Sequence, residues 1–120
     1  MRAKERIVFL DRAAFTSEEL PIPSFDHNWS EYPDTDTADL VPRLFWATIA
    51  ITHACPLDAV AIGQLHKLKQ IVVTGPAMVD ADVSSARGIA VRRLPLSDVP
   101  GEALIDLLEA LVVEAQGPVM

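Results

Sequence analysis

The sequence predicts an α/β protein in which strands and helices alternate along the chain. Two short runs rich in β-branched residues, at 47–56 and 70–76, each end in a polar or glycine-bearing break, which is typical of buried strands. A helical pattern lies between the two runs, and a strand–helix–strand unit places both strands parallel in one sheet. The whole chain contains five such strands and an extra C-terminal apolar helix, which predicts a flavodoxin-like three-layer sandwich with strand order 2-1-3-4-5.

The first part of the chain predicts two strands and one helix. Residues 7–10 are an apolar run that fits a buried central strand. Prolines and small polar residues predict mostly loop over 16–39, interrupted by a short second strand around 29–32. A helix is expected over 38–46, where apolar residues recur on one face.

The remaining strands alternate with two shorter helices. The helix between the first two runs begins after Asp58, a suitable N-cap residue. Its expected apolar positions are Val60, Ile62, Leu65 and Leu68. A short helix at 82–87 is ended by Gly88, and 89–94 returns as the fifth strand.

The C-terminal helix predicted over 99–116 is apolar around most of its circumference. Its polar residues Glu102, Asp106 and Glu109 form one narrow stripe. We expect one small sheet to cover only one side of this helix, leaving several large side chains partly in water, namely Leu104, Leu107, Leu108, Leu111 and Val112. The predicted organisation is therefore a flavodoxin-like unit at 1–98 and an oligomerisation or inter-domain helix at 99–116, with a homodimer formed through that helix.

Composition limits the size of the protein and its partners. A chain of 120 residues, 50% of them hydrophobic, builds one core. Seventeen acidic residues against 10 basic ones give a net charge of −7, which disfavours nucleic acid and anionic membranes as partners. The single cysteine cannot form an internal disulfide, and the apolar run at 7–10 is too short for a signal peptide or a membrane span, so a cytoplasmic protein is expected.

The candidate place for a ligand is the carboxyl edge of the predicted sheet, where ligands bind in open parallel sheets. A small anion could bind backbone amides near Gly75, with Arg12 or His53 adding charge or hydrogen-bond donors. A tight strand-to-helix turn at Gly75 is the plain structural alternative. His53 and Cys55 have the chemistry of a nucleophile and base or of metal ligands, but no orienting group or third ligand is evident nearby, so we predict no catalytic residue and no metal site.

The residues from 51 to 91 also carry a family resemblance. The strand ending Ile-Thr-His, the following Pro-Leu-Asp, the helix ending Leu-His-Lys-Leu-Lys and the strand ending Thr-Gly stand in the order Ile51 to Gly75. Asp80 follows five residues after Gly75, and Gly-Ile-Ala-Val ends at Val91. This order resembles the N-terminal substrate domain of the D-isomer-specific 2-hydroxyacid dehydrogenases, in particular the glycerate dehydrogenase-like branch.

The resemblance implies a role for the fourth strand's loop. In that family the loop binds the substrate carboxylate through backbone amides, a role that would pass to Thr74 and Gly75. Two departures remove polar groups: the family's Asn-Lys pair is His53-Ala54 here, and its Asp-Asn pair after the glycine is Ala77-Met78.

The parts of the family that carry oxidoreductase chemistry find no match in the sequence. The resemblance assigns a G-x-G-x-x-G phosphate loop, a substrate-orienting arginine and a histidine–glutamate pair to a nucleotide-binding domain, and these 120 residues contain no G-x-G-x-x-G. We therefore expect no cofactor in this chain, with NAD bound only if a separate nucleotide-binding domain is present. The leading hypothesis is a stand-alone substrate-domain homologue, catalytically incomplete alone, that binds a small carboxylate or serves as an assembly module.

Two further interpretations remain open. The chain could be a truncated or split part of an NAD-dependent, glycerate-type dehydrogenase, completed by a separate nucleotide-binding polypeptide. A designed flavodoxin-like scaffold is disfavoured by the irregular proline-rich stretch at 21–33.

Overall fold

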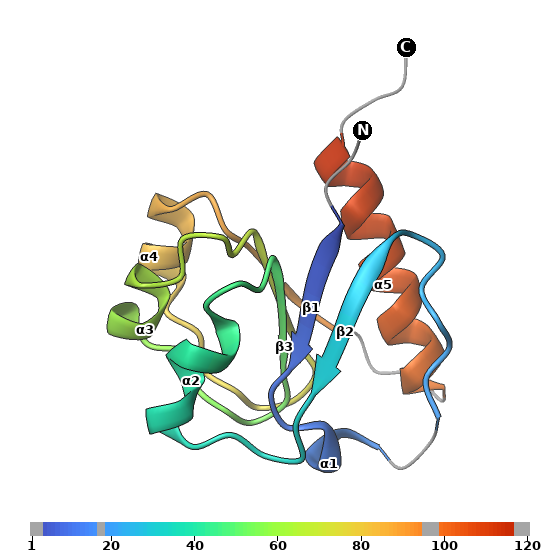
Figure 1. The fold of residues 1–120 in the computed structure, drawn as a ribbon, viewed down its shortest axis with the longest axis horizontal. Coiled ribbons are helices and arrows are strands. Elements are labelled where there is room, and N and C mark those ends of the chain that lie inside the picture. The colour runs from blue at the N-terminus through green and yellow to red at the C-terminus, as the bar shows by residue number, and fades with distance from the viewer. Residues whose placement is uncertain (1–3, 17–18, 95–98, 117–120) are drawn as a thin grey trace.

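The computed structural model describes residues 4–16, 19–94 and 99–116, and it has the predicted five-stranded parallel sheet (Figure 1). The strands are β1 Glu5–Phe9, β2 His27–Glu31, β3 Ile49–Thr52, β4 Gln70–Val73 and β5 Ala90–Arg93. Their order, β2-β1-β3-β4-β5, confirms the predicted topology. Within the described ranges, no helix is both long and apolar enough to cross a bilayer.

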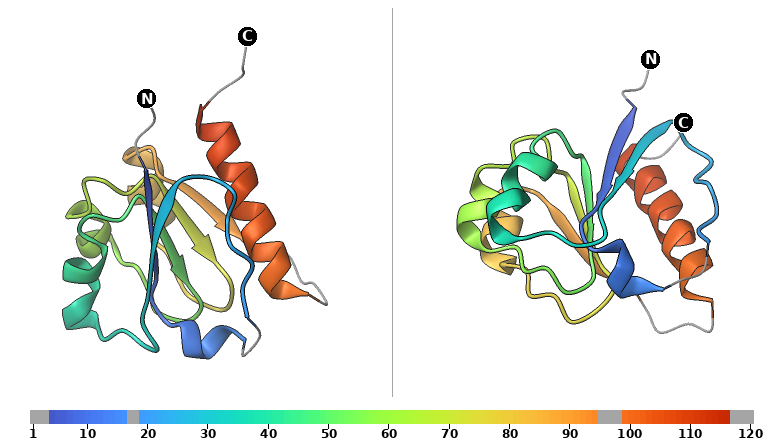
Figure 2. Two further views of the ribbon diagram at one scale, coloured as in Figure 1. Left: turned by 45° about the vertical axis from the view of Figure 1, so that its right-hand side comes forward. Right: turned by 60° about the horizontal axis from the view of Figure 1, so that its bottom comes forward.

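The helices cover both faces of the sheet, which gives three layers (Figure 2). One face carries α2 Thr37–Leu44, α3 Ala59–Gly63 and α4 Ala81–Ala86, and the other carries α5 Pro100–Gln116. A short helix that was not predicted, α1 Arg12–Phe15, follows β1 at the carboxyl edge (Figure 1).

Alternating side chains of the central strands build two separate cores. Ile7 and Phe9 of β1 pack with α5, whereas Val8 belongs to the core under α2 and α3. In β3, Ile49 and Ile51 likewise face α5. Because both of their faces are covered, the central strands β1, β3 and β4 are largely apolar, and this is why they are recognisable as short continuous runs in the sequence.

The expected exposure of α5 is wrong. Leu104 and Leu108 are 0% exposed, and Leu111 and Val112 are also buried; Leu107 is half-buried. The sheet covers one side of the helix, and the segment 19–26 covers a second.

That second cover comes from residues expected to be only loop. Leu20 and Phe25 pack against the α5 core, and the Ser24 N–H donates to Glu109 Oε2 at 2.8 Å. The apolar side chains Leu104, Leu108, Leu111 and Val112 of α5 are thus buried by their own chain. The homodimer was expected because these side chains would otherwise be exposed, and that reason no longer holds. The homodimer itself stays a prediction.

The capping residues in the sequence predicted where the helices α3 and α4 begin, but the apolar pattern overestimated the length of α3. The N-caps are confirmed, since Asp58 accepts from the Ala61 N–H and Asp80 accepts from the Val83 N–H, each at 2.9 Å. Helix α3, however, ends at Gly63, so two of its four expected apolar positions, Leu65 and Leu68, are buried from the turn that follows. A third, Val60, is 73% exposed. Gly88 has φ +73°, which explains the end of α4 at a residue that tolerates left-handed backbone.

Candidate functional site

The candidate site lies at the carboxyl edge of the sheet, next to α1 (Figure 1). The parallel register aligns the strand ends: Phe9 pairs with Ile51, Thr52 pairs with Val73, and Val73 pairs with Arg93. The loops after β1, β3 and β4 and the end of β5 therefore meet at one edge.

Three of the four predicted site residues come together there. His53 Nδ1 lies 3.0 Å from Thr74 Oγ1, so the loops after β3 and β4 are joined by their side chains. A Cβ atom added to Gly75 would lie 2.6 Å from Cε1 and Nε2 of the His53 imidazole, which is inside van der Waals contact. The bare backbone of Gly75 is therefore required by the position of His53, independently of any ligand.

The backbone amides of the β4 loop are mostly used. The Thr74 N–H donates to the Thr52 carbonyl at 2.9 Å, and the Ala77 N–H donates to the His53 carbonyl at 3.0 Å. Pro76 has no N–H to offer. Of residues 74–77, only Gly75 retains an N–H with no acceptor among the described residues. The predicted cradle of two amides is thus reduced to one amide beside an imidazole.

A buried carboxylate that sequence reasoning did not select organises the neighbouring loop. Asp11 is 6% exposed, and its Oδ1 accepts from the His53 N–H at 2.7 Å. Its Oδ2 accepts from the N–H groups of Ala54 at 2.7 Å and Cys55 at 3.2 Å. These three bonds compensate the buried charge and fix the backbone from which the His53 side chain extends. The available signal was an aspartate directly after a buried central strand.

The fourth predicted site residue, Arg12, is engaged elsewhere. Its Nε lies 3.8 Å from Glu31 Oε2, and its Nη1 donates to the Thr16 carbonyl. Its Cζ also lies 5.9 Å from the centroid of the Phe15 ring, which contacts His53 edge-on at 6.2 Å between centroids. The guanidinium is therefore committed to β2 and to α1.

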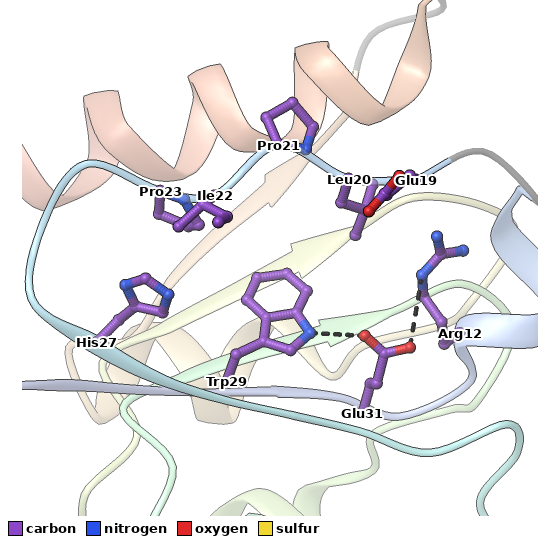
Figure 3. A pocket seen from close by; sticks show the side chains of 9 residues that line it. All are labelled: Arg12, Glu19, Leu20, Pro21, Ile22, Pro23, His27, Trp29 and Glu31. Carbon is purple, nitrogen blue, oxygen red and sulfur yellow. Dashed lines mark hydrogen bonds and ion pairs between the residues drawn. The ribbon is translucent and has the colours of Figure 1, made fainter.

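Arg12 belongs to a separate pocket of about 340 Å³ (Figure 3). Leu20, Pro21 and Pro23 form one wall and Trp29 and Glu31 the other, with Arg12 at one end. Glu31 Oε1 accepts from the Trp29 Nε1–H at 2.8 Å, so the carboxylate is shared between Trp29 and Arg12. Trp29 packs against the α5 core, so this hollow lies on the α5 side of β2, and Gly75 is not among the residues that line it.

His53 and Cys55, considered above as a nucleophile and base or as metal ligands, contact different parts of the chain. The imidazole turns to Thr74, whereas Cys55 Sγ lies 3.7 Å from the Thr35 carbonyl oxygen. Burial, and secondarily the charge of Asp11, raises the pKa of the Cys55 thiol, which disfavours the reactive thiolate. Among the residues that the structure describes, no three His, Cys, Asp or Glu side chains converge as metal ligands.

A second residue missed at the sequence level is Arg93, the last residue of β5. Its Nη1 lies 3.4 Å from the Gly75 carbonyl oxygen and its Nη2 lies 3.3 Å from the Ala77 carbonyl oxygen. The positively charged guanidinium of Arg93 therefore contacts the loop that contains the unpaired Gly75 N–H. The sequence predicted that the fifth strand lies beside the fourth. A charged residue at the end of the fifth strand could therefore have been recognised as a neighbour of the loop that contains Gly75.

The fold and this edge define the chain as a doubly wound α/β domain with its candidate site at the carboxyl ends of the strands. Over 92 residues the sequence is 38% identical to a candidate 2-hydroxyacid dehydrogenase of Haemophilus influenzae, covering 74% of this chain and 29% of that protein. The fold matches the NAD⁺-bound crystal structure of 3-phosphoglycerate dehydrogenase from Entamoeba histolytica, with a TM-score of 0.62 and 18% identity over 78% of this chain and 33% of that one. No family model matches the sequence.

The resemblance to 2-hydroxyacid dehydrogenases is thereby confirmed, and this chain is homologous to a segment of such a protein. It spans less than a third of the curated relative it matches.

Proposed function

We propose that this chain binds a small 2-hydroxy or 2-oxo carboxylate at the carboxyl edge of the sheet and supplies the substrate side of a D-2-hydroxyacid dehydrogenase site. The observation that carries the proposal is the unused Gly75 N–H beside the His53 ring. An unpaired amide at the carboxyl end of a central strand is a donor that a carboxylate can use.

The surrounding groups support an anion at this point. Asp11 carries a negative charge nearby, but three backbone N–H groups already compensate it. His53 is held at its backbone by Asp11 and at its Nδ1 by Thr74, so its ring is oriented before a ligand arrives. Arg93 adds positive charge on the same loop. In this arrangement Gly75 binds the carboxylate, and His53 and Thr74 orient the adjacent C2 oxygen.

A dinucleotide does not fit the amides at the first turns of α3 and α4 or those in the loop after β3. The first turns of α3 and α4 are capped by the carboxylates of Asp58 and Asp80. Asp11 occupies the amides of residues 53–55. A pyrophosphate at any of these places would meet a carboxylate, which is the opposite of the glycine-rich turn that dinucleotides require.

We therefore expect the chain alone neither to bind NAD nor to oxidise D-glycerate or D-lactate. NAD, when bound to a nucleotide-binding domain placed against this edge, would supply the hydride acceptor. The alternative that this chain is one part of a working dehydrogenase is favoured by the match to 29% of its curated relative. NAD-dependent turnover by this polypeptide alone would overturn the division of labour proposed here.

The binding proposal is tested by thermal shift with D-lactate, D-glycerate and pyruvate on three proteins. The wild type should be stabilised by at least one acid. Gly75→Ala should lose the shift, because the new Cβ displaces the His53 ring that it would meet at 2.6 Å. Gly63→Ala is the matched control, because a Cβ there meets nothing within 4 Å.

Two outcomes separate binding from folding. Gly75→Ala must keep a cooperative melting transition without ligand for the lost shift to count. A double variant, His53→Ala with Gly75→Ala, removes the clash; partial recovery of binding assigns the carboxylate to the Gly75 amide. A shift that is unchanged in Gly75→Ala places the site elsewhere.

A further inference from the structure

We infer that the site selects acids with a second negative group, and that Arg93 is the residue that makes the selection. The inference rests on the proposed carboxylate site at Gly75 and names its substrate class: a 2-hydroxy or 2-oxo acid that also carries a carboxylate or phosphate. Monoanionic acids of the same size should bind more weakly.

The position of Arg93 supports this role. The residue ends β5 and pairs in register with Val73, which directly precedes Thr74. Its guanidinium bridges two carbonyl oxygens of the loop, those of Gly75 and Ala77, at 3.4 and 3.3 Å. The side chain is exposed. A guanidinium has five N–H donors, so these two long contacts orient the group while leaving donors for a ligand.

The charge of Arg93 is not neutralised by the described part of the chain. The ion pairs found there involve Arg12, Arg43 and Lys69, and none includes Arg93. The whole protein has a net charge of −7, so acidic residues outnumber basic ones, and a guanidinium without a carboxylate partner is unusual in such a chain. An unneutralised guanidinium at the rim of an anion site favours a second anionic group.

The geometry separates the two negative groups of such a ligand. The first carboxylate uses the Gly75 N–H, while Arg93 contacts the carbonyl on the other side of the same residue. Only the Cα of Gly75 thus separates the amide that binds the first carboxylate from the carbonyl group that holds Arg93, a short spacing that suits the carbon chain of a malate-like acid. A phosphorylated hydroxy acid presents the same charge pattern, and the experiment distinguishes the two.

The chain provides a closely matched control in Arg92. Successive residues of a strand point to opposite faces, so Arg92 faces away from the loop that Arg93 contacts. Its Nη1 donates to the carbonyl of Val91, the residue before it, at 3.3 Å. Arg92→Gln and Arg93→Gln change the net charge equally, one residue apart, at exposed positions.

The test measures dissociation constants by calorimetry for D-2-hydroxybutyrate, D-malate and D-3-phosphoglycerate. The wild type should bind D-malate or the phosphorylated acid roughly threefold to fivefold more tightly than D-2-hydroxybutyrate, the upper range for an exposed ion pair. Added salt should reduce this preference. Arg93→Gln should abolish it, Arg93→Lys should keep part of it, and Arg92→Gln should leave it intact.

The outcomes distinguish this inference from the function on which it rests. Equal binding of all three acids by the wild type, or a preference that survives in Arg93→Gln, overturns the role of Arg93 while leaving the Gly75 site standing. Absence of binding by every acid overturns the carboxylate site and, with it, the selectivity. Tighter binding of D-malate than of the phosphorylated acid assigns the second group as a carboxylate, and the reverse assigns it as a phosphate.

Discussion

Replacing Asp11 with asparagine tests whether the buried carboxylate holds the loop that carries His53. The side chain keeps its shape but retains one acceptor oxygen in place of two. The best orientation puts that oxygen at the Oδ2 position, where it still accepts from Ala54 and Cys55. The new NH₂ group then faces the His53 N–H, whose bond to Oδ1 at 2.7 Å is lost.

The expected cost follows from these contacts. A hydrogen bond to a charged group contributes about 1.5–3 kcal/mol, and the two remaining bonds weaken as their acceptor becomes neutral. We expect Asp11→Asn to lower the free energy of unfolding by about 2–4 kcal/mol. With a urea dependence of about 2 kcal/mol per molar, the midpoint should fall by roughly 1–2 M.

The assay is urea unfolding followed by tryptophan fluorescence, combined with hydrogen exchange of the amides of residues 53–55. Asp26→Asn is the control, because this exposed aspartate undergoes the same change in charge. Its midpoint should stay close to that of the wild type. Equal midpoints for the two variants, with unchanged exchange at 53–55, would refute the role given to Asp11.

Two further predictions concern α5 and Cys55. Leu108 is fully buried against the sheet, so Leu108→Ala should lower the free energy of unfolding by about 3 kcal/mol and Leu108→Glu should prevent folding. Val113 is 65% exposed, so Val113→Glu is the control and should have neither effect. Sedimentation of both proteins checks this packing. If the wild type is a dimer and Leu108→Glu is a folded monomer, α5 is not buried within its own chain as described. Because the pKa of the Cys55 thiol is raised by burial and by Asp11, its alkylation rate should reach half-maximum at a higher pH in the folded chain than in the unfolded peptide, and Asp11→Asn should lower that pH. Identical pH profiles for folded and unfolded chains would show that neither effect acts on the thiol.

The contrast between β3 and α5 shows what kind of information the sequence holds. The run Ile49–Thr52 is apolar and β-branched, and in the structure all four of its residues are buried, so composition alone predicts a central strand. The residues of α5 are equally apolar, yet their cover depends on Leu20 and Phe25, which stand in a stretch that composition assigns to loop. No local pattern links 19–26 to a helix more than 70 residues away, and this is why the predicted exposure failed.

The candidate site divides in the same way. The sequence by itself determined the parallel sheet, its strand order and the edge to which His53, Thr74 and Gly75 belong, because these follow from local periodicity and from the handedness of strand–helix–strand units. Only the tertiary structure decided which donors at that edge remain available. Asp11 closes the loop of His53 across 42 positions of sequence, the Thr74 amide is used by Thr52, and Arg12 turns to Glu31. Hydrogen bonds between distant residues depend on how the strands are brought together, so the open Gly75 amide and the Arg93 guanidinium beside it exist as a pair only in the folded chain.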